Sequence, residues 1–218
     1  MQGLLNEMSS ALQAGKAKMV KELVEKALAD GVSAKDILER GLLSGMDVVA
    51  VKFKNNEIYV PEVLVAARAM NTGAALLKPH LAESGAKPVG KAIIGTVKGD
   101  LHDIGKNLVR MMFEGKGIEV IDLGVDVPME KFIEAYYTEK PDIVALSALL
   151  TTTMGEMKNV VEAFSNEATR SDVVIMVGGA PITDSFRESI GADIYTPDAA
   201  TAAEAAKQAI MRLRGKSA

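Results

Sequence analysis

The sequence of 218 residues contains two histidines, and one of them, His102, is followed directly by an aspartate and preceded by another two positions earlier. The stretch Gly99–Gly105 reads Gly-Asp-Leu-His-Asp-Ile-Gly. An imidazole is a nitrogen ligand for transition metals, and a nearby carboxylate, here Asp100, can hydrogen-bond the far ring nitrogen and fix the tautomer. One short loop therefore supplies a candidate metal ligand and the group that would orient it.

This loop lies between a predicted strand and a predicted helix. Residues 91–98 form an apolar run typical of a buried strand, and residues 105–115 have apolar side chains at helical spacing. Further strands are predicted at 117–123, 142–148, 172–177 and 192–196, and further helices at 129–139, 154–168, 183–190 and 198–214. Five alternating units with right-handed crossovers predict an α/β fold, a flavodoxin-like doubly wound five-stranded parallel sheet.

Residues 1–85 have a different pattern, in which apolar side chains recur every three or four positions in four segments. Ser33 is a suitable N-cap for the third segment. Pro61 suits the first turn of the fourth, which we expect to end before Pro79. Four short amphipathic helices with short connections predict an N-terminal four-helix bundle, a cap domain.

The glycines and proline in residues 82–90 indicate a linker, so we expect a helical-bundle cap at 1–85 and a second domain at 91–218. The hydrophobic fraction of 48% allows a sizeable core. A net charge of -4 argues against nucleic acid as a partner, and no apolar run approaches the length of a membrane span. The absence of cysteine excludes disulfides and thiolate chemistry, and no secretory signal is visible, so we expect a cytoplasmic protein.

In a doubly wound sheet, ligands bind at the carboxyl ends of the strands, where the strand order reverses. The loop at Asp100 should therefore lie beside Ser147–Thr153, a hydroxyl-rich segment that follows the third strand. The glycine pair Gly178 and Gly179 follows the fourth strand, and Tyr195–Ala200 follows the fifth. These small, hydroxyl-bearing and weakly charged surfaces suit a large, weakly charged ligand better than a nucleoside triphosphate.

Several competing sites do not fit the residues. A phosphate-binding loop is excluded because the glycine and lysine after the loop are followed by Asn107, and no Gly-x-Gly-x-x-Gly follows the first strand. A phospho-acceptor domain needs an aspartate where Ser147 stands. A hydrolytic metal centre needs more ligands than this loop offers, and the second histidine, His80, is expected to be exposed in the helical part. From composition alone, His102 could also be a loop histidine that caps a helix.

Three motifs in chain order carry a family resemblance. They are Asp100-x-His102-x-x-Gly105, Ser147-x-Leu149 and Gly178-Gly179. Together they resemble the cobalamin-binding module of cobalamin-dependent methionine synthase, and still more the stand-alone corrinoid proteins of anaerobic methyltransferase systems. The resemblance covers essentially the whole chain, since those proteins also pair a four-helix cap with a flavodoxin-like corrinoid domain. It implies cobalamin or a related corrinoid as cofactor, in methylcobalamin and cob(I)alamin states.

The resemblance also implies roles for individual residues. His102 would replace the lower base of the corrinoid as the cobalt ligand, with Asp100 and Thr153 as a hydrogen-bond relay behind it. Methionine synthase has serine at the Thr153 position, so the relay geometry differs. In the cap, Phe53 and Val60 would cover the methyl-bearing face, and Val60 is smaller than the leucine of methionine synthase, so the shielding would be looser. The other residues expected to contact the corrinoid and its displaced nucleotide tail are Leu101, Asp103, Ile104, Gly105, Ser147, Leu149, Thr151, Gly178, Gly179, Tyr195 and Ala199.

The function implied by the resemblance is that of a methyl carrier, a subunit of a methyltransferase system rather than a complete enzyme. Cobalt would accept a methyl group from a donor-specific methyltransferase and pass it to a second methyltransferase, and a reductive activator would be a further partner. The alternative is a corrinoid-binding sensor or storage module without turnover. Such sensors usually carry a DNA-binding or signalling domain, and no basic helix-turn-helix stretch appears in this sequence.

Overall fold

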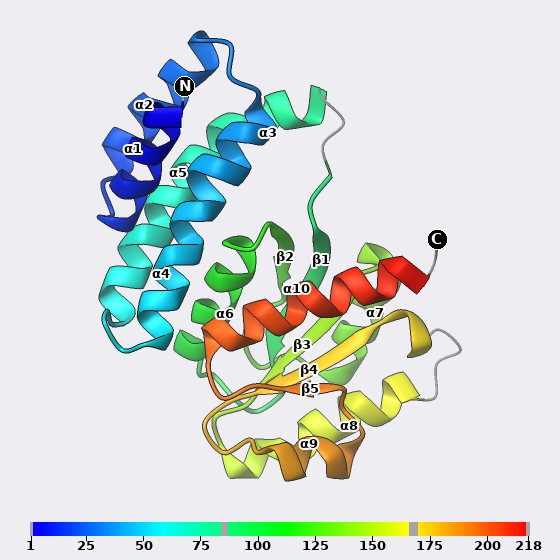
Figure 1. The fold of residues 1–218 in the computed structure, drawn as a ribbon. Coiled ribbons are helices and arrows are strands. Elements are labelled where there is room, and N and C mark those ends of the chain that lie inside the picture. Colours follow the sequence, from blue (N-terminus) through cyan, green and yellow to red (C-terminus); the bar gives the residue numbers. More distant parts are fainter. Residues whose placement is uncertain (1, 84–86, 166–169, 217–218) are drawn as a thin grey trace. The chain divides into compact units, whose positions relative to one another are not determined.

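The computed structural model of the chain forms two compact units, which are described separately (Figure 1). The residues described are 2–83, 87–165 and 170–216. The helical unit comprises Met1–Pro88 and Gly115–Gly117, and the α/β unit comprises Val89–Glu114 and Ile118–Ala218. The domain limits given above remain predictions, and residues 84–86 of the expected linker lie outside the described residues. No helix in the described part of the chain is long and apolar enough to cross a membrane.

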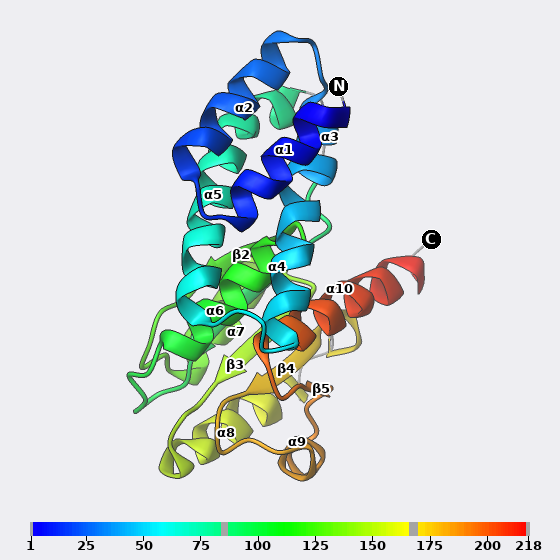
Figure 2. The ribbon, with the colours of Figure 1, turned by 60° about the vertical axis from the view of Figure 1, so that its left-hand side comes forward.

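The helical unit is a bundle whose helices lie side by side (Figure 2). Its helices are α1 (Gln2–Gln13), α2 (Ala17–Ala29), α3 (Ala34–Asp36), the π-helix η1 (Ile37–Leu43), α4 (Ser44–Lys54) and α5 (Val60–Glu83). The apolar stripes predicted from the sequence form its core, with Met8, Val24 and Val63 fully buried. The predicted N-cap is confirmed, because the backbone N–H of Asp36 donates to the Ser33 hydroxyl over 3.0 Å.

The third predicted helix differs from a plain α-helix, since η1 joins α3 to α4 as a widened π turn without a break. A Cβ on Gly41 would lie 2.6 Å from the Met8 sulfur, and one on Gly45 would lie 3.1 Å from the Ser9 carbonyl oxygen. These two glycines therefore let α1 pack closely against this helix. Hydrophobic periodicity does not distinguish such a turn from an ordinary one.

The fourth predicted helix extends further than expected, because α5 continues through Pro79 to Glu83. The expected stop before Pro79 is thus wrong. A proline removes one hydrogen bond of the helix ladder, and here it does so in the last part of α5, just after the fully buried Leu77. At the other end, the backbone N–H of Tyr59 donates to the Glu62 carboxylate over 3.0 Å, which caps the first turn.

The α/β unit contains a five-stranded parallel sheet of order β2-β1-β3-β4-β5, which confirms the flavodoxin-like prediction. The strands are β1 (Gly90–Thr96), β2 (Ile118–Asp122), β3 (Ile143–Ser147), β4 (Val174–Gly178) and β5 (Ile194–Tyr195). The helices are α6 (Ile104–Glu114), α7 (Met129–Glu139), η2 (Thr151–Thr153), α8 (Met154–Ser165), η3 (Arg170–Asp172), α9 (Asp184–Ile190) and α10 (Ala199–Lys216). In this order β1 and β3 are neighbours, so the loops that follow them meet at one edge.

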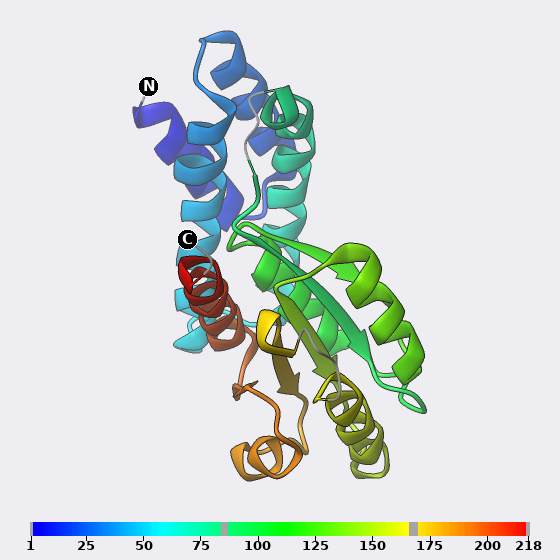
Figure 3. The same ribbon diagram turned by 90° about the vertical axis from the view of Figure 1, so that its right-hand side faces the viewer.

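The sheet has helices on both faces (Figure 3). Val144 belongs to a core cluster with Phe164 of α8, on the face that α7 and α8 cover. The register pairs Ile94 with Ala145 and Ala145 with Met176, and these three side chains lie on the opposite face. Helices α6 and α10 pack together on that second face.

One predicted strand is shorter than expected. Strand β5 is confined to Ile194–Tyr195, whereas 192–196 was expected. Pro197 lacks a backbone N–H and cannot extend the ladder. Helix α8 is described over Met154–Ser165, and residues 166–168 of the predicted 154–168 helix lie outside the described residues.

Candidate functional site

The loop after β1 is held by the backbone as well as by side chains. The backbone N–H of Gly99 donates to the Asp126 carboxylate over 2.7 Å, and the Asp126 N–H returns a hydrogen bond to the carbonyl of Asp100 over 2.9 Å. The Thr96 hydroxyl, at the end of β1, donates to the His102 carbonyl over 2.8 Å. Gly99 has a φ of +81°, a conformation that favours glycine. These contacts turn the chain so that Asp100 points inward.

The Asp100 carboxylate is fully buried and accepts hydrogen bonds on both oxygens. Its Oδ1 accepts from the backbone N–H and the Nδ1 of His102, over 3.0 and 2.7 Å. Its Oδ2 lies 2.7 Å from the Leu149 N, 3.2 Å from the Leu150 N and 3.0 Å from the Thr153 hydroxyl. Burial by itself raises the pKa of Asp100, but the donors from His102, Leu149 and Thr153 outweigh it and hold this pKa well below its ordinary value. The group is therefore a carboxylate at neutral pH.

The imidazole of His102 is oriented by this carboxylate. Because Asp100 accepts from Nδ1, the proton of the neutral ring lies on Nδ1, and Nε2 keeps a free lone pair. The side chain is 51% exposed, and Nε2 has no hydrogen-bond partner within the described residues. The ring is thus a preoriented nitrogen ligand that faces outward. Leu101 and Ile104, which flank it in sequence, are 72% and 76% exposed and form an apolar surface beside the ring.

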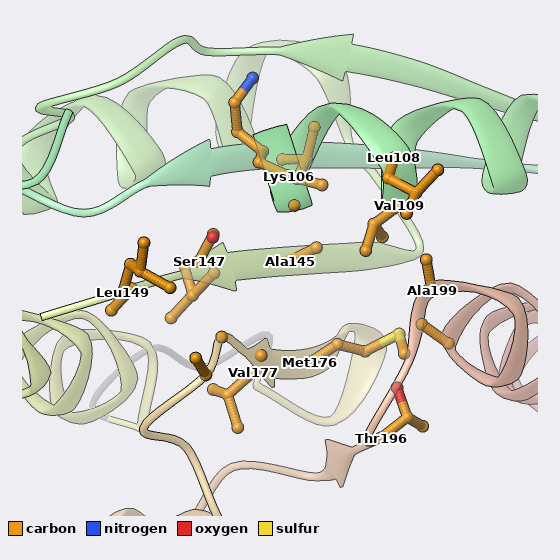
Figure 4. Close-up of a pocket in the computed structure, with 18 of the residues that line it drawn as sticks. Lys106, Leu108, Val109, Ala145, Ser147, Leu149, Met176, Val177, Thr196 and Ala199 are labelled. Carbon is orange, nitrogen blue, oxygen red and sulfur yellow. The ribbon is translucent and has the colours of Figure 1, made fainter. Parts of the chain in front are cut away.

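A cavity of about 560 Å³ adjoins His102 and lies between the sheet and the helices α6 and α10. Figure 4 shows side chains from both helices and from the neighbouring strands around it. The predicted site residues that line it are Leu101, His102, Asp103, Ile104, Gly105, Ser147, Leu149, Gly178, Gly179, Tyr195 and Ala199. The volume lies in the range of small-molecule and cofactor sites.

The remaining predicted residues lie elsewhere. Asp100 and Thr153 lie behind the His102 ring rather than on the cavity wall. Thr151 is exposed at the start of η2 and is not among the residues that line the cavity. Phe53 and Val60 belong to the helical unit, where both side chains are half-buried.

Sequence reasoning missed the inner part of the cavity. Ala145 and Met176 come from the middle of strands, and Val109 comes from α6, so each read simply as an apolar core position. It also missed Lys106, whose buried ammonium forms an ion pair with both oxygens of Asp122 over 2.5 Å. A small alanine between larger apolar residues in a buried strand was the available signal for the cavity, and it is a weak one.

The donor set argues against a free metal ion as the ligand. The described residues contain no group of three or more His, Asp or Glu side chains that could hold a metal. His102 is a single outward-facing candidate ligand beside a large, mostly apolar cavity. Such a site fits a metal that already has most of its ligands, in a flat macrocycle with an attached side chain.

Family models support this interpretation. A model described as a B12 binding domain matches residues 90–207, and a second model with the same description matches residues 4–78. The chain is 42% identical over 210 residues to dimethylamine corrinoid protein 3 of Methanosarcina acetivorans, which covers 96% of this chain and 98% of that protein. It is 40% identical over 195 residues to the trimethylamine corrinoid protein of Methanosarcina barkeri, with 88% of this chain and 90% of that protein covered.

Solved structures agree with the sequence comparisons. The methanol:cobalamin methyltransferase complex MtaBC from Methanosarcina barkeri contains a chain that matches with a TM-score of 0.85 at 30% identity, covering 98% of this chain and 84% of that one. A cobalamin-binding protein from Desulfitobacterium hafniense matches with a TM-score of 0.77 at 30% identity, covering 94% of this chain and 98% of that one.

Proposed function

The chain belongs to the family of corrinoid proteins with B12 binding domains, and from this premise we propose that it is a methyl carrier between two methyltransferases. The observation that carries the proposal is the buried Asp100 carboxylate, which presents the imidazole of His102 with a free Nε2 at the mouth of the cavity. When bound, the cobalt of the corrinoid supplies the atom that accepts and releases the methyl group. This chain supplies the environment of that atom.

The residues present fit a corrinoid. A corrin already supplies most of the ligands of its cobalt, so a single protein ligand would suffice, and His102 would be that ligand. The exposed side chains of Leu101, Ile104 and Leu149 offer an apolar surface to the flat ring. A Cβ placed on Gly105 or Gly178 would meet no atom within 4 Å, so both backbones are open to a closely approaching ligand.

The relay behind His102 controls the proton on the ring. Asp100 stabilises the Nδ1 proton, and Thr153 is one of the donors that keep Asp100 ionised. A carboxylate behind an imidazole raises the basicity of the free nitrogen and so strengthens it as an axial ligand. A metal would use the Nε2 lone pair, and the relay keeps that lone pair available by holding the proton on Nδ1.

The nucleotide tail of the corrinoid occupies the cavity between α6 and α10 in this proposal. Ser147 and Leu149 line its entrance at the end of β3, and Gly178, Tyr195 and Ala199 line the side formed by β4, β5 and α10. A tail held in this cavity would be kept away from the cobalt, which His102 would then hold.

The proposal gives Phe53 and Val60 the role of covering the upper face of the corrinoid. It is supported by two exposed large side chains at this end of the helical unit, Val51 in α4 and Tyr59 just before α5, which are 58% and 67% exposed. Apolar cover protects a reactive centre from water, and it must move aside for the partner enzymes.

The proposed partners are a donor-specific methyltransferase, a second methyltransferase and a reductive activator. The relatives named for dimethylamine and trimethylamine, and the methanol:cobalamin methyltransferase complex among the solved structures, favour small methylated donors. The cytoplasm is the proposed compartment, which cell fractionation would test.

Replacing each of the two histidines by alanine in turn tests whether His102 is the cobalt ligand. The protein is loaded with cobalamin, and its visible absorption spectrum is compared with those of His102→Ala and His80→Ala. We expect His102→Ala to change the cobalt spectrum and His80→Ala, an exposed residue of α5, to leave it unchanged. A spectrum of His102→Ala identical to that of the unaltered protein would refute the ligand assignment. Loaded protein that binds cobalamin but transfers no methyl group with any candidate partner would favour a storage or sensor role.

A further inference from the structure

The wall of the cavity is apolar where the central strands form it. Ile94, Ala145 and Met176 are register partners on β1, β3 and β4, so their side chains lie in one row across the sheet. All three line the cavity, and Figure 4 shows Ala145 and Met176 on the side of the strands that faces it. None of these side chains carries an N–H, an O–H or an oxygen. The small Ala145 between two larger neighbours leaves the space that a planar group needs.

The helices complete this wall with further apolar side chains. Val109 of α6 and Ala202 of α10 line the cavity opposite the strand row. The charged side chains nearby are already paired. Lys106 donates to Asp122, and each oxygen of the Asp198 carboxylate accepts a hydrogen bond from Thr201 at the start of α10.

Three of the lining residues, Ser147, Tyr195 and Thr196, carry a hydroxyl. The Ser147 hydroxyl has no hydrogen-bond partner within the described residues, and it follows Ala145 on the same face of β3. The Thr196 hydroxyl lies on a different side of the cavity from Ser147, as Figure 4 shows. It is within 3.4 Å of the Asp198 carbonyl, which already takes its proton. The strand row therefore offers no polar side chain, and the hydroxyls come from the ends of β3 and β5 and from the residue after β5.

We propose that this cavity selects the base of the corrinoid's nucleotide tail by polarity, and that it prefers a benzimidazole to a purine. The inference rests on the proposed function, because it requires the tail to occupy the cavity. A benzimidazole that has left cobalt exposes one ring nitrogen, which the Ser147 hydroxyl can satisfy. Adenine exposes further ring nitrogens and an amino group, and the row of Ile94, Ala145 and Met176 offers them no partner.

The expected size of the preference follows from the cost of unpaired polar groups. A buried donor or acceptor that loses its hydrogen bond to water without replacement costs enough to change an affinity by about fivefold to more than a hundredfold. One such group on the purine gives a preference of at least about fivefold, and two give more.

Binding of two corrinoids by the full chain tests this inference. Equilibrium dialysis measures the dissociation constants for cobalamin, whose base is dimethylbenzimidazole, and for its adenine-containing analogue. In part of the free corrinoid the base has already left cobalt, and the absorption spectrum of the free corrinoid gives this fraction. Each dissociation constant is corrected for it. We expect cobalamin to bind at least about fivefold more tightly. A smaller ratio would overturn the inference.

A matched pair of variants locates the effect. Ala145→Ser adds one hydroxyl to the apolar row, and we expect it to lower the ratio of the two dissociation constants by at least about threefold. Ala92→Ser makes the same change on β1, at a fully buried position that is not among the cavity-lining residues, and should leave the ratio unchanged. If the ratio is unchanged in Ala145→Ser and a circular dichroism melt shows that this variant is folded, the inference is overturned and the proposed function is not affected. Failure of both corrinoids to bind the unaltered protein would overturn the proposed function as well.

Discussion

A Cβ placed on Gly179 would lie 1.8 Å from the carbonyl oxygen of Ala148, so the loop after β4 touches the end of β3 backbone to backbone. Gly179 also has a φ of +136°, which side-chain-bearing residues rarely adopt. A Cβ placed on the neighbouring Gly178 would have no atom within 4 Å, and the φ of Gly178 is ordinary. Two adjacent glycines are therefore present for different reasons, one for packing and one for open space at the cavity.

The two glycines predict opposite phenotypes. We expect Gly179→Ala to lose about 3 kcal/mol of unfolding free energy or more. The new methyl group would clash with the backbone of Ala148, which cannot move aside as a flexible side chain could. Gly178→Ala should change stability by less than about 1 kcal/mol and weaken corrinoid binding, since its methyl group enters the cavity. Urea denaturation and cobalamin titration measure the two effects. Equal stability of both variants would contradict this assignment.

The buried carboxylate predicts a large effect for a small change at Asp100. Asp100→Asn places an amide N–H₂ among donors from His102, Leu149 and Thr153, so at least one donor loses its acceptor. We expect a loss of about 3 kcal/mol in the apo-protein, measured by urea denaturation. Asp103→Asn is the control: this side chain is exposed and accepts a hydrogen bond from the Asn107 side chain, so the effect should be within about 0.5 kcal/mol.

The lowered pKa of Asp100 also predicts a pH dependence. Folding keeps this group ionised far below its ordinary pKa of 3.8, so its contribution to stability is fully present above that value and is lost as the pH falls towards the folded-state pKa. We expect the unfolding free energy of the apo-protein to decline from about pH 5 downward, and to decline less steeply in Asp100→Asn. Chemical denaturation at a series of pH values between neutrality and acid measures both slopes. Parallel slopes would show that other carboxylates cause the decline.

Thr153 should adjust this pH dependence through its hydroxyl. Thr153→Val keeps the shape but removes a donor to Asp100, so the pKa of Asp100 should rise and acid unfolding should begin at a higher pH. The cost at neutral pH is expected to be about 1 kcal/mol. Thr153→Ser retains the hydroxyl and should keep the acid midpoint of the unaltered protein. A shift of similar size in both variants would point to packing rather than hydrogen bonding.

The ion pair of Lys106 and Asp122 predicts strong coupling between two positions. The pKa of Asp122 is lowered overall: burial raises it, and the hydrogen bonds from Lys106 and from the Gly124 N–H outweigh that effect. Lys106→Met removes the closest cation and should cost about 2 kcal/mol or more, because a partly buried carboxylate is left without its main partner. The double variant Lys106→Met, Asp122→Leu should recover part of that loss. Urea denaturation of Lys106→Met, Asp122→Leu and the double variant gives the coupling energy, and additive losses would mean that the pair is energetically independent.

The sequence alone predicted the features that depend on nearby residues. Strand and helix periodicity gave the five-stranded parallel sheet and its order, because short alternating units leave few topologies. Asp100 and His102 are two residues apart in one loop, so their hydrogen bond follows from local geometry. The N-cap at Ser33 is local in the same way.

Features that join distant segments depended on the tertiary structure. The Leu149 and Leu150 amides reach Asp100 from about fifty residues away, and no spacing rule indicates them. Ala145 and Met176 become cavity residues only through the register of β3 and β4 and the helices that cover that face. Periodicity reports which face of an element is apolar. Whether that face meets a packed neighbour or an open cavity is decided by the elements brought against it, and therefore by the fold as a whole.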